Sequence, residues 1–300
     1  MKIIICGGGG FIGQNLVRHL LDRGHQIVVL DRNRSRISSP QLQSFQVDLL
    51  RPDLFEQKWF DGVGAVVNLS GKDILTFWTD KARRMIRESR ITVNKNLIEF
   101  IGGLLQRPEV FVSASAAGYY GDKGEREVSE EDARGKGFLA DVCEGWEAEA
   151  RRAESLGMRS VQIRTAPVLL KSGGILMQLM KSMSFGFTFV FGSGQQWFPW
   201  LHMTDLIRIY EEAITNRNLS GPVNAASPNP MRFRNLLSCL TCYKKAVILP
   251  FPVFILKLLL QETADVVLFS QRVLPVKLVK AGFQFSYPEL DQALKEIFSK

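Results

Sequence analysis

The sequence predicts an α/β protein with a doubly wound parallel sheet and a smaller, mainly helical C-terminal lobe. An apolar segment at 2–6 leads into a glycine-rich turn, and an amphipathic helix begins at residue 11. A second apolar segment ends in Asp31. Strand-like and helix-like segments then alternate as far as residue 165, as is typical of a parallel sheet with helices on both faces.

The glycine-rich turn at 7–13 has glycines at three regularly spaced positions. Gly7 permits a tight turn, Gly10 removes a Cβ where a pyrophosphate approaches the backbone, and Gly13 lets the helix pack closely on the strand. The N-terminus of that helix offers free N–H groups and the positive end of its dipole to phosphates. A purely structural turn is the alternative, but the strand before it and the helix after it favour a dinucleotide site.

The end of the second strand carries two opposing signals for the cofactor. Asp31, 18 residues after Gly13, can accept hydrogen bonds from the adenosine ribose, which favours NAD. The neighbouring Arg32 can clamp a 2′-phosphate and stack on adenine, which favours NADP. We therefore expect NAD or NADP, oxidised or reduced, and leave the choice between them open.

The remaining elements of the predicted sheet follow in chain order. We expect strands at 44–47, 64–69, 110–113, 159–165 and 223–226, and helices at 78–105, 138–156 and 175–183. Because the carboxyl ends of parallel strands line one crevice, the cofactor should lie along Asp48, Leu49, Asn68, Leu69, Ser70 and Gly71. An N-cap for the next helix explains Asp48 equally well.

The composition is that of an ordinary globular protein of one or two domains. The chain has 300 residues, 46% hydrophobic and 23% charged. We expect residues 1–170, with 200–228 returning to them, to form a nucleotide-binding domain, and 171–199 with 229–300 to form the substrate lobe. The net charge of +8 favours attraction of anionic small molecules, and we do not expect a nucleic-acid partner.

Several other classes of protein are disfavoured. Four cysteines do not form a secreted disulfide framework, and Cys239 with Cys242 indicates core packing on a helix more than a metal site, so no metal is expected. The apolar run at 246–256 contains two prolines and is too short to span a membrane. We expect a cytoplasmic protein. We expect the apolar segment 253–260 to be a helix buried against the main lobe. A contact of that segment with a protein or membrane is the alternative.

A series of motifs extends over nearly the whole chain. They lie at 7–13, 67–71, 89–90, 113–121, 142–147, 194–195, 200–205, 271–275 and 281–283. In this order they resemble the extended short-chain dehydrogenase/reductase superfamily, in its atypical branch of nucleoside-diphosphate-sugar epimerase-like and cell-division-inhibitor-like proteins. The resemblance implies a Rossmann fold that binds NAD(P). It also implies cofactor contacts from Gly7, Gly10, Phe11, Ile12, Gly13, Asp31, Arg32, Leu69, Ser70, Arg90 and the backbone near Val168.

The catalytic residues that the resemblance implies are incomplete. The superfamily moves the proton with a Tyr-x-x-x-Lys pair, in which the lysine lowers the pKa of the tyrosine. Tyr119 and Lys123 have this spacing, but they lie about 25 residues too early, in a glycine-bounded loop. The expected place holds Cys143 and Glu147, so the usual dyad is absent.

Ser115 is the nearest candidate for holding a substrate oxygen, with closure of the strand end by a backbone hydrogen bond as the alternative. Tyr120 is a candidate for lining the substrate pocket. The catalytic candidates are thus Ser115, Tyr119, Tyr120, Cys143 and Glu147. His202 and Asp205, three residues apart, are expected on one helix face, where they brace the segment between the lobes.

Two functions remain open from the sequence. The first is an NAD(P)-dependent oxidoreductase or epimerase that acts on a hydroxyl-bearing small molecule, with a nucleotide sugar as one candidate substrate. The second is a non-catalytic protein that binds NAD(P)H as a sensor or scaffold, and the missing dyad motivates it. A homodimer is also left open.

Overall fold

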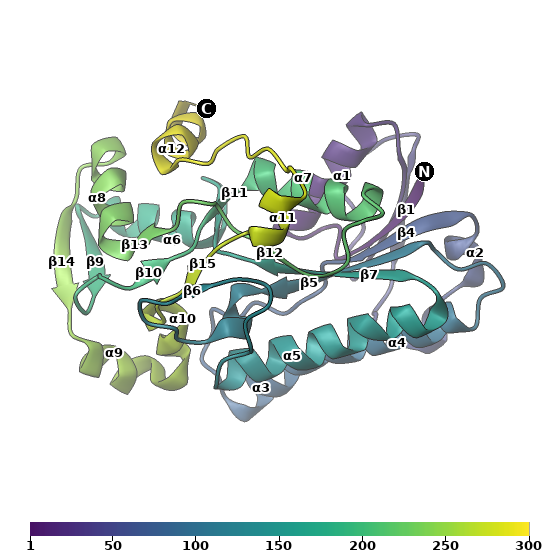
Figure 1. Cartoon of the computed structure of the whole chain (residues 1–300), viewed down its shortest axis with the longest axis horizontal. Helices are drawn as coiled ribbons and strands as arrows, with labels where there is room; N and C mark the ends of the chain where they lie inside the picture. The colour runs from purple at the N-terminus through teal and green to yellow at the C-terminus, as the bar shows by residue number, and fades with distance from the viewer. Residues whose placement is uncertain (300) are drawn as a thin grey trace.

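The computed structural model describes residues 1–299 and contains a seven-stranded sheet in the order β12-β7-β5-β4-β1-β2-β3. All six neighbouring pairs are parallel, so the predicted doubly wound sheet is confirmed (Figure 1). The strands are β1 (Lys2–Cys6), β2 (Gln26–Asp31), β3 (Leu42–Gln46), β4 (Val63–Asn68), β5 (Val110–Ala116), β7 (Arg159–Thr165) and β12 (Gly221–Ala225). The predicted strands at 44–47 and 110–113 are thus displaced or shorter than those observed, as is usual for strand ends.

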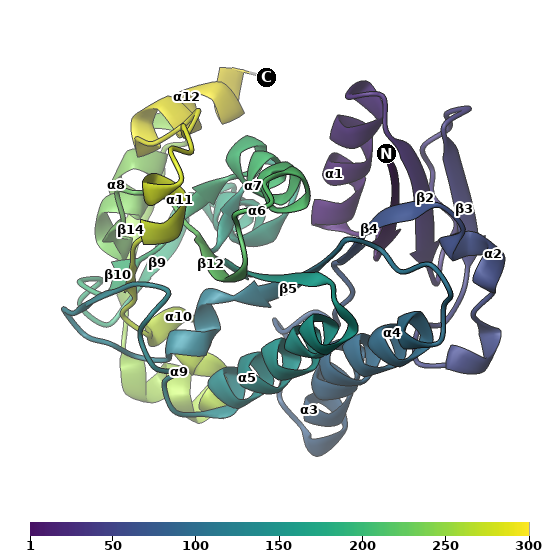
Figure 2. The same ribbon diagram turned by 45° about the vertical axis from the view of Figure 1, so that its right-hand side comes forward.

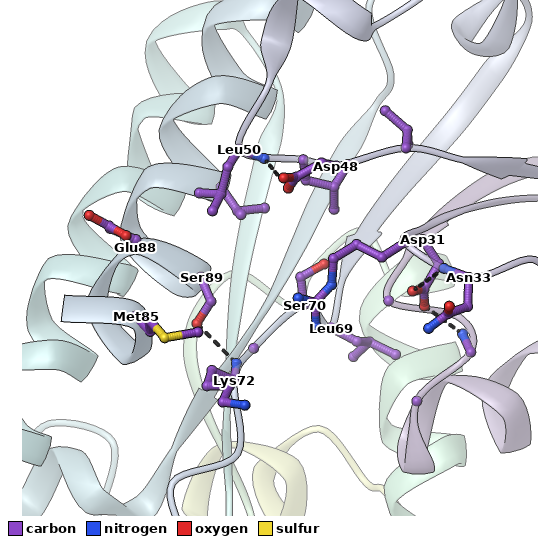
Figure 3. Close-up of a pocket in the computed structure, with 18 of the residues that line it drawn as sticks. Asp31, Asn33, Asp48, Leu50, Leu69, Ser70, Lys72, Met85, Glu88 and Ser89 are labelled. Carbon is purple, nitrogen blue, oxygen red and sulfur yellow. Dashed lines mark hydrogen bonds between the residues drawn. The ribbon is translucent and has the colours of Figure 1, made fainter. Parts of the chain in front are cut away.

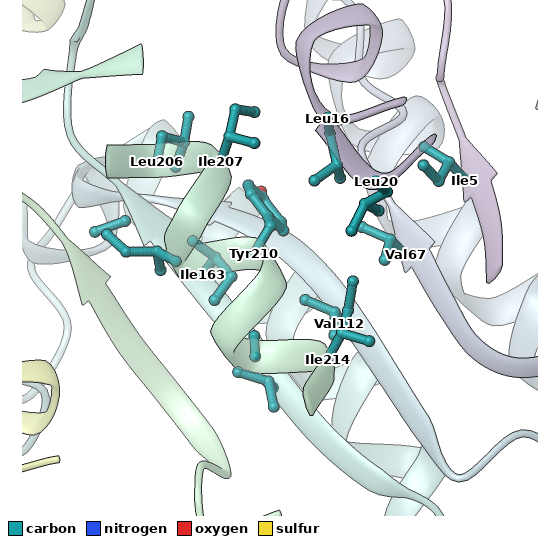
Figure 4. Close-up of a cluster of buried hydrophobic side chains, with 14 of the residues drawn as sticks. Ile5, Leu16, Leu20, Val67, Val112, Ile163, Leu206, Ile207, Tyr210 and Ile214 are labelled. Carbon is teal, nitrogen blue, oxygen red and sulfur yellow. The ribbon is translucent and has the colours of Figure 1, made fainter. Parts of the chain in front are cut away.

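Helices cover both faces of this sheet. On one face lie α1 (Phe11–Asp22) and α7 (Met203–Thr215), and on the other α4 (Val93–Gly102) and α5 (Phe138–Arg151) (Figure 2). Successive residues of β1 point to opposite faces, so Ile3 and Ile5 join one apolar core while Ile4 and Cys6 join the other. Figure 4 shows the first of these cores, where side chains of α1 and α7 meet over the strands. Burial on both faces explains the almost uninterrupted apolar strands.

The long helix predicted at 78–105 is present but interrupted. It consists of α3 (Asp80–Arg87), a π-helical turn at Glu88–Thr92 (the π-turn below) and α4. Thr79 caps the start, since its Oγ1 accepts a hydrogen bond from the Ala82 N–H. A π-turn inserts an extra residue into the helix and is frequent at functional sites.

The rest of the chain forms short elements around the main sheet and the smaller lobe. Two-stranded ribbons pair β6 (Glu127–Val128) with β15 (Arg272–Val273), β8 (Val168–Leu169) with β11 (Leu201–His202), β9 (Phe187–Phe191) with β14 (Val247–Phe251), and β10 (Trp197–Phe198) with β13 (Met231–Arg232). The remaining α-helices are α2 (Gln57–Phe60), α6 (Gly174–Met183), α8 (Phe233–Tyr243), α9 (Val253–Leu260), α10 (Asp265–Leu268), α11 (Val276–Lys280) and α12 (Leu290–Ser299). Single 3₁₀ turns lie at Pro52–Leu54, Ala117–Tyr120, Arg152–Leu156 and Gln261–Ala264.

The smaller lobe has an apolar core of its own, formed mainly by α6, α8 and α12. It is mainly helical, as expected, and Figure 1 places it at the end of the sheet beyond β12. The division into 1–170 with 200–228, and 171–199 with 229–300, stays a prediction.

The prediction for the apolar segment 253–260 is wrong in one respect. The segment is helical, as α9, but only Leu256 is buried, while Phe254 and Leu258 are 73% and 78% exposed. The helix is too uniformly apolar for periodicity to indicate which side faces inward. The Cys239–Cys242 pair also differs from the prediction, because Cys239 is only partly buried on α8 and Cys242 is exposed.

His202 and Asp205 connect α7 to the end of the chain, which agrees with a bracing role. His202 caps the start of α7 instead of sharing a helix face with Asp205, because its Nδ1 accepts a hydrogen bond from the Thr204 N–H. Its Nε2 lies 3.1 Å from Glu296, near the end of the chain. Asp205 is buried and accepts the N–H groups of Ser286 and Tyr287. Among residues 1–299, no helix has the length and apolar character needed to cross a membrane.

Candidate functional site

A cleft of about 660 Å³ opens at the carboxyl ends of β1, β2 and β4 (Figure 3). This is the edge of a doubly wound sheet where nucleotides bind. Nine of the predicted cofactor residues line it: Gly7, Gly10, Asp31, Arg32, Asp48, Leu49, Leu69, Ser70 and Gly71. The cleft therefore gathers side chains and backbone from strand ends that are far apart in the sequence.

The glycine turn has the tight geometry that its sequence predicts. Gly7 has a positive φ of 78°, and a Cβ there would lie 3.0 Å from the backbone of Leu69 and Ser70. A Cβ on Gly13 would lie 2.3 Å from the Gly7 carbonyl oxygen. A Cβ on Gly10, by contrast, would meet only that carbonyl oxygen, at 3.3 Å. Two glycines are thus required by the fold itself, whereas Gly10 leaves room at the N-terminus of α1.

Asp31 holds the glycine turn to the end of β2. Its Oδ2 accepts the Gly9 N–H at 2.9 Å and its Oδ1 accepts the Asn33 N–H at 3.3 Å. Both carboxylate oxygens therefore already accept a backbone hydrogen bond. Asp48 likewise accepts the Leu50 N–H at 3.0 Å, so its carboxylate stabilises its own turn and caps no helix.

The adenosine side of the cleft is rich in cations. Arg32, Arg34 and Arg36 all line it, and within residues 1–299 none of the three forms an ion pair with a carboxylate. Lys72 adds a fourth cation from the loop after β4. The alternation of arginines at 32, 34 and 36 was visible in the sequence, whereas the contribution of Lys72 was missed, because nothing local marks a lysine beyond a strand end as a cleft residue.

The loop after β4 is fixed by the π-turn. The Lys72 N–H donates to Ser89 Oγ at 2.9 Å, and Arg90 Nη1 donates to the Lys72 carbonyl oxygen at 2.9 Å. Asn68 is buried below the loop, where its Oδ1 accepts the Ser70 N–H at 3.0 Å. Asn68 therefore shapes the cleft and does not line it. The sequence did not indicate the π-turn, since an extra residue in a helix leaves the apolar pattern nearly unchanged.

The other predicted cofactor residues lie near the cleft without lining it. The Phe11 ring packs on Gly173, where a Cβ would lie 2.2 Å from the ring. Ile12 and Gly13 follow in the first turn of α1, and Val168 is buried in β8, where it pairs with Leu201. Their assignment as cofactor contacts stays a prediction.

Three of the five catalytic candidates, Ser115, Tyr120 and Glu147, lie in a buried polar group that they form with Arg164 and Asn224 and that we call the Glu147 cluster. Glu147 accepts from Ser115 Oγ at 2.7 Å and from Arg164 Nε and Nη2 at 2.9 and 2.8 Å. The Tyr120 hydroxyl donates to Asn224 Oδ1 at 2.6 Å and accepts from Arg164 Nη1 at 2.9 Å. These polar groups are thus partnered within the protein, as buried ion pairs require.

Two candidates in this region are held in their neutral forms. Burial, reinforced by the nearby Glu147 carboxylate, raises the pKa of the Cys143 thiol to about 12. Burial also raises the pKa of Tyr120, although Arg164 opposes the shift. Tyr120 is fully buried, so the expectation that it lines a substrate pocket is wrong. Its neighbour Arg164 was missed, although an arginine in the middle of an apolar strand indicates a buried counter-ion.

Tyr119 and Lys123 do not come together as their spacing suggested. The guanidinium carbon of Arg164 lies 3.5 Å from the centre of the Tyr119 ring. Lys123 Nζ donates instead to the Ala133 carbonyl oxygen at 3.2 Å. Both residues are thus held by contacts of the loop, and their role as an active pair stays a prediction.

Comparison with known proteins places the chain among epimerase-like proteins. A model of the NAD dependent epimerase/dehydratase family matches residues 3–226, and a domain of unknown function (DUF1731) matches residues 251–297. The epimerase family protein SDR39U1 homolog of Arabidopsis thaliana, described as chloroplastic, is 36% identical over 99% of this chain and 86% of its own length. The epimerase family protein YfhF of Bacillus subtilis is 31% identical over 100% of this chain and 98% of its own.

Solved structures agree with this placement. The human epimerase family protein SDR39U1, solved with NADPH, has a TM-score of 0.85 and 27% identity, and the match covers 100% of both chains. A UDP-glucuronic acid 4-epimerase from Bacillus cereus, solved with UDP-glucuronic acid and NAD, has a TM-score of 0.81 and 19% identity, over 100% of this chain and 98% of its own. The second likeness concerns the fold alone.

Proposed function

The chain belongs to the NAD dependent epimerase/dehydratase family, and from this premise we propose that it is an NAD(P)-dependent oxidoreductase or epimerase acting on a hydroxyl-bearing small molecule. A nucleotide sugar is the first substrate class to test, because solved proteins with this fold carry such molecules. The cofactor supplies hydride transfer, and the chain supplies binding and orientation. The cytoplasm as compartment and a homodimer stay predictions.

The observation that carries the proposal is the shape and charge of the cleft. The glycine turn leaves room at Gly10, and the N-terminus of α1 faces the cleft. Three arginines that have no carboxylate partner among residues 1–299 line its adenosine side. Such a site binds anionic nucleotides through backbone N–H groups and guanidinium groups. Nothing in the Glu147 cluster is needed for this part of the function.

We further propose that the cleft prefers NADP(H). The Asp31 carboxylate already accepts hydrogen bonds from Gly9 and Asn33, which reduces its capacity to hold a ribose diol. Arg32, Arg34 and Arg36 around it favour a 2′-phosphate. The human relative solved with NADPH supports this order of preference.

Titration with NAD+, NADH, NADP+ and NADPH, followed by calorimetry and thermal shift, tests both statements. We expect NADPH to bind more tightly than NADH, and Arg32→Gln to weaken NADPH by about tenfold while NADH changes little, since a charge-assisted contact contributes about 1.5–3 kcal/mol. Asp31→Ser, at the position before Arg32, is the matched change of opposite charge. It should improve NADPH binding, because it removes a negative charge. If none of the four nucleotides binds, the proposed function is contradicted.

The alternative is a non-catalytic protein that senses NAD(P)H, and one observation favours it. The residues at the usual place of the catalytic pair are either buried in the Glu147 cluster or, like Cys143, hold a high pKa. A panel of sugars, nucleotide sugars and carbonyl compounds, assayed by the absorbance of reduced nicotinamide, separates the two functions. Turnover of any member supports the enzyme, and tight NADPH binding without turnover on the whole panel supports the sensor.

A further inference from the structure

Two segments of the smaller lobe contain basic residues but no acidic ones. From 171 to 204 and from 229 to 261 there is no aspartate or glutamate, although the whole chain has 38 basic and 30 acidic residues. The cations of the two segments are Lys171, Lys181, Arg232, Arg234, Lys244, Lys245 and Lys257. Of these, Arg232 alone forms an ion pair among residues 1–299, with Glu125 at 2.6 Å. This part of the molecule therefore carries a local excess of positive charge.

Large apolar side chains protrude from the same two segments. On α9, Phe254, Leu258 and Leu259 are all exposed. Phe185, just before β9, is 78% exposed, and Val247, at the start of β14, is 63% exposed. Side chains exposed to this degree stand out from the surface instead of lining a groove. Single exposed apolar residues are normal in a folded protein, but a group of this size on neighbouring elements marks an interaction surface.

The ribbon of β9 and β14 connects these side chains along one edge of the lobe. The Val247 N–H donates to the Gly186 carbonyl oxygen at 2.9 Å, which sets Val247 beside the segment that carries Phe185. Lys244 Nζ donates to Ser184 Oγ at the same end of the ribbon. At the other end, β14 leads directly into α9, and both lie at the end of the molecule opposite α2 (Figure 1). The five residue pairs of the ribbon separate its two ends by about 16 Å.

Lysines accompany the apolar side chains at both ends of this edge. Lys244 and Lys245 precede β14, and Lys257 lies on α9 among the exposed residues. The acid that acts on Lys257, Asp265 of α10, is beyond ion-pair distance. We call this edge the β14–α9 face, and its residues are Phe185, Lys244, Lys245, Val247, Phe254, Lys257, Leu258 and Leu259.

The charge of the β14–α9 face distinguishes between possible occupants. A second copy of this chain, packed symmetrically on the same face, would bring the lysines of both copies together, and like charges repel. An anionic lipid surface offers what both kinds of side chain need. Its headgroups attract lysines, and the boundary between headgroups and acyl chains accepts protruding apolar side chains.

We propose that the β14–α9 face docks the protein onto the surface of a membrane that contains anionic lipids. In this arrangement α9 lies in the plane of the surface, with its exposed apolar side chains inserted and its lysine at the level of the lipid phosphates. None of the residues of the face lines the cleft at the carboxyl ends of β1, β2 and β4. The inference therefore stands independently of the proposed function.

The test is co-sedimentation of the full chain with vesicles of phosphatidylcholine alone and with vesicles that contain about one third phosphatidylglycerol. We expect the wild type to bind the anionic vesicles only, and high salt to weaken the binding. Lys244→Gln combined with Lys245→Gln should weaken it by about fivefold for each lysine removed. Phe254→Gln combined with Leu258→Gln should weaken it by about tenfold or more, because the apolar contact is lost.

Matched controls are available at exposed positions away from the face. Leu105→Gln replaces a leucine that is 95% exposed after α4, and Lys136→Gln combined with Lys280→Gln removes two exposed lysines. Both controls should bind vesicles as the wild type does. Since these side chains are exposed, thermal melting should be unchanged in the controls and in the Phe254–Leu258 variant, which separates a loss of binding from a loss of fold.

Several results would overturn the proposal. One is the absence of wild-type binding to anionic vesicles, and another is binding that the controls weaken as much as the variants of the face do. Binding that Phe254→Gln with Leu258→Gln leaves unchanged would reduce the face to general attraction of charge. A dimer in light scattering that the same variant dissociates would assign the face to a second copy. Binding of poly-L-glutamate as tight as that of the vesicles would assign it to an acidic protein.

Discussion

The cleft at the carboxyl ends of β1, β2 and β4 and the Glu147 cluster lie at the ends of neighbouring strands of one sheet. They differ in whether their charged side chains have partners within the protein. In the cleft, Arg32, Arg34 and Arg36 line the open space and form no ion pair with a carboxylate among residues 1–299. In the cluster, Glu147, Arg164 and Tyr120 are buried and partnered with one another. The cleft is prepared for a ligand, whereas the cluster is complete without one.

This difference separates a binding site from a structural support. Unpaired cations beside a cavity lower the free energy of a bound anion. A buried and bidentate ion pair instead fixes the elements that carry it, here β5, β7, α5 and β12, and has little capacity left for a substrate. Carboxylates and phenols near a sheet edge are therefore not by themselves a sign of catalysis.

The strongest test of this comparison is Glu147→Gln. The change leaves Arg164 buried without its counter-ion, so we expect a loss of about 3–5 kcal/mol in the free energy of unfolding, measured by chemical denaturation. The matched control is Glu109→Gln, whose side chain is 67% exposed and pairs with Arg217 at 3.1 Å. That change should cost less than about 0.5 kcal/mol. Equal effects of the two changes would show that the cluster does not support the fold.

Gly10→Ala, a change in the cleft, is expected to have an intermediate effect: a small loss of stability and a larger loss of NADPH binding. Gly10 has ordinary extended backbone angles, and the added Cβ meets only the Gly7 carbonyl oxygen at 3.3 Å, so the unfolding free energy should fall by less than about 1 kcal/mol. The same methyl group occupies space that the pyrophosphate needs, and NADPH binding should weaken by about tenfold or more.

Gly13→Ala is the contrasting change in the same turn. Its Cβ would lie 2.3 Å from the Gly7 carbonyl oxygen, so this variant should lose stability even without ligand. If Gly10→Ala binds NADPH as the wild type does, the pyrophosphate does not lie over this turn.

We expect the smallest effect from Cys143→Ser. The quantity measured is the rate of thiol labelling at mildly alkaline pH. Burial raises the pKa of Cys143 to about 12, so the protein should show one fast thiol, the exposed Cys242. Cys242→Ser should remove the fast phase, and Cys143→Ser should leave it unchanged. Labelling of Cys143 as fast as that of Cys242 would show that the region beside the Glu147 cluster opens in solution.

The sequence alone determined the parallel sheet and the position of the cleft. Both follow from short-range signals, namely apolar strands buried on two faces, a glycine turn between strand and helix, and acidic or basic residues directly after strands. The residues from 7 to 13, Asp31 and the arginines that follow all lie within one strand–helix–strand unit, so their proximity needed no knowledge of the rest of the chain.

Only the tertiary structure decided which polar residues are free and which are partnered. Arg164 and Glu147 are 17 residues apart and Tyr120 and Asn224 are 104 apart, so their pairing depends on the order of strands in the sheet. The exposure of α9 and the position of the π-turn likewise depend on neighbours that the local pattern does not specify. Spacing predicts which residues share an element, but the partners of a buried charge are set by the elements that pack against it.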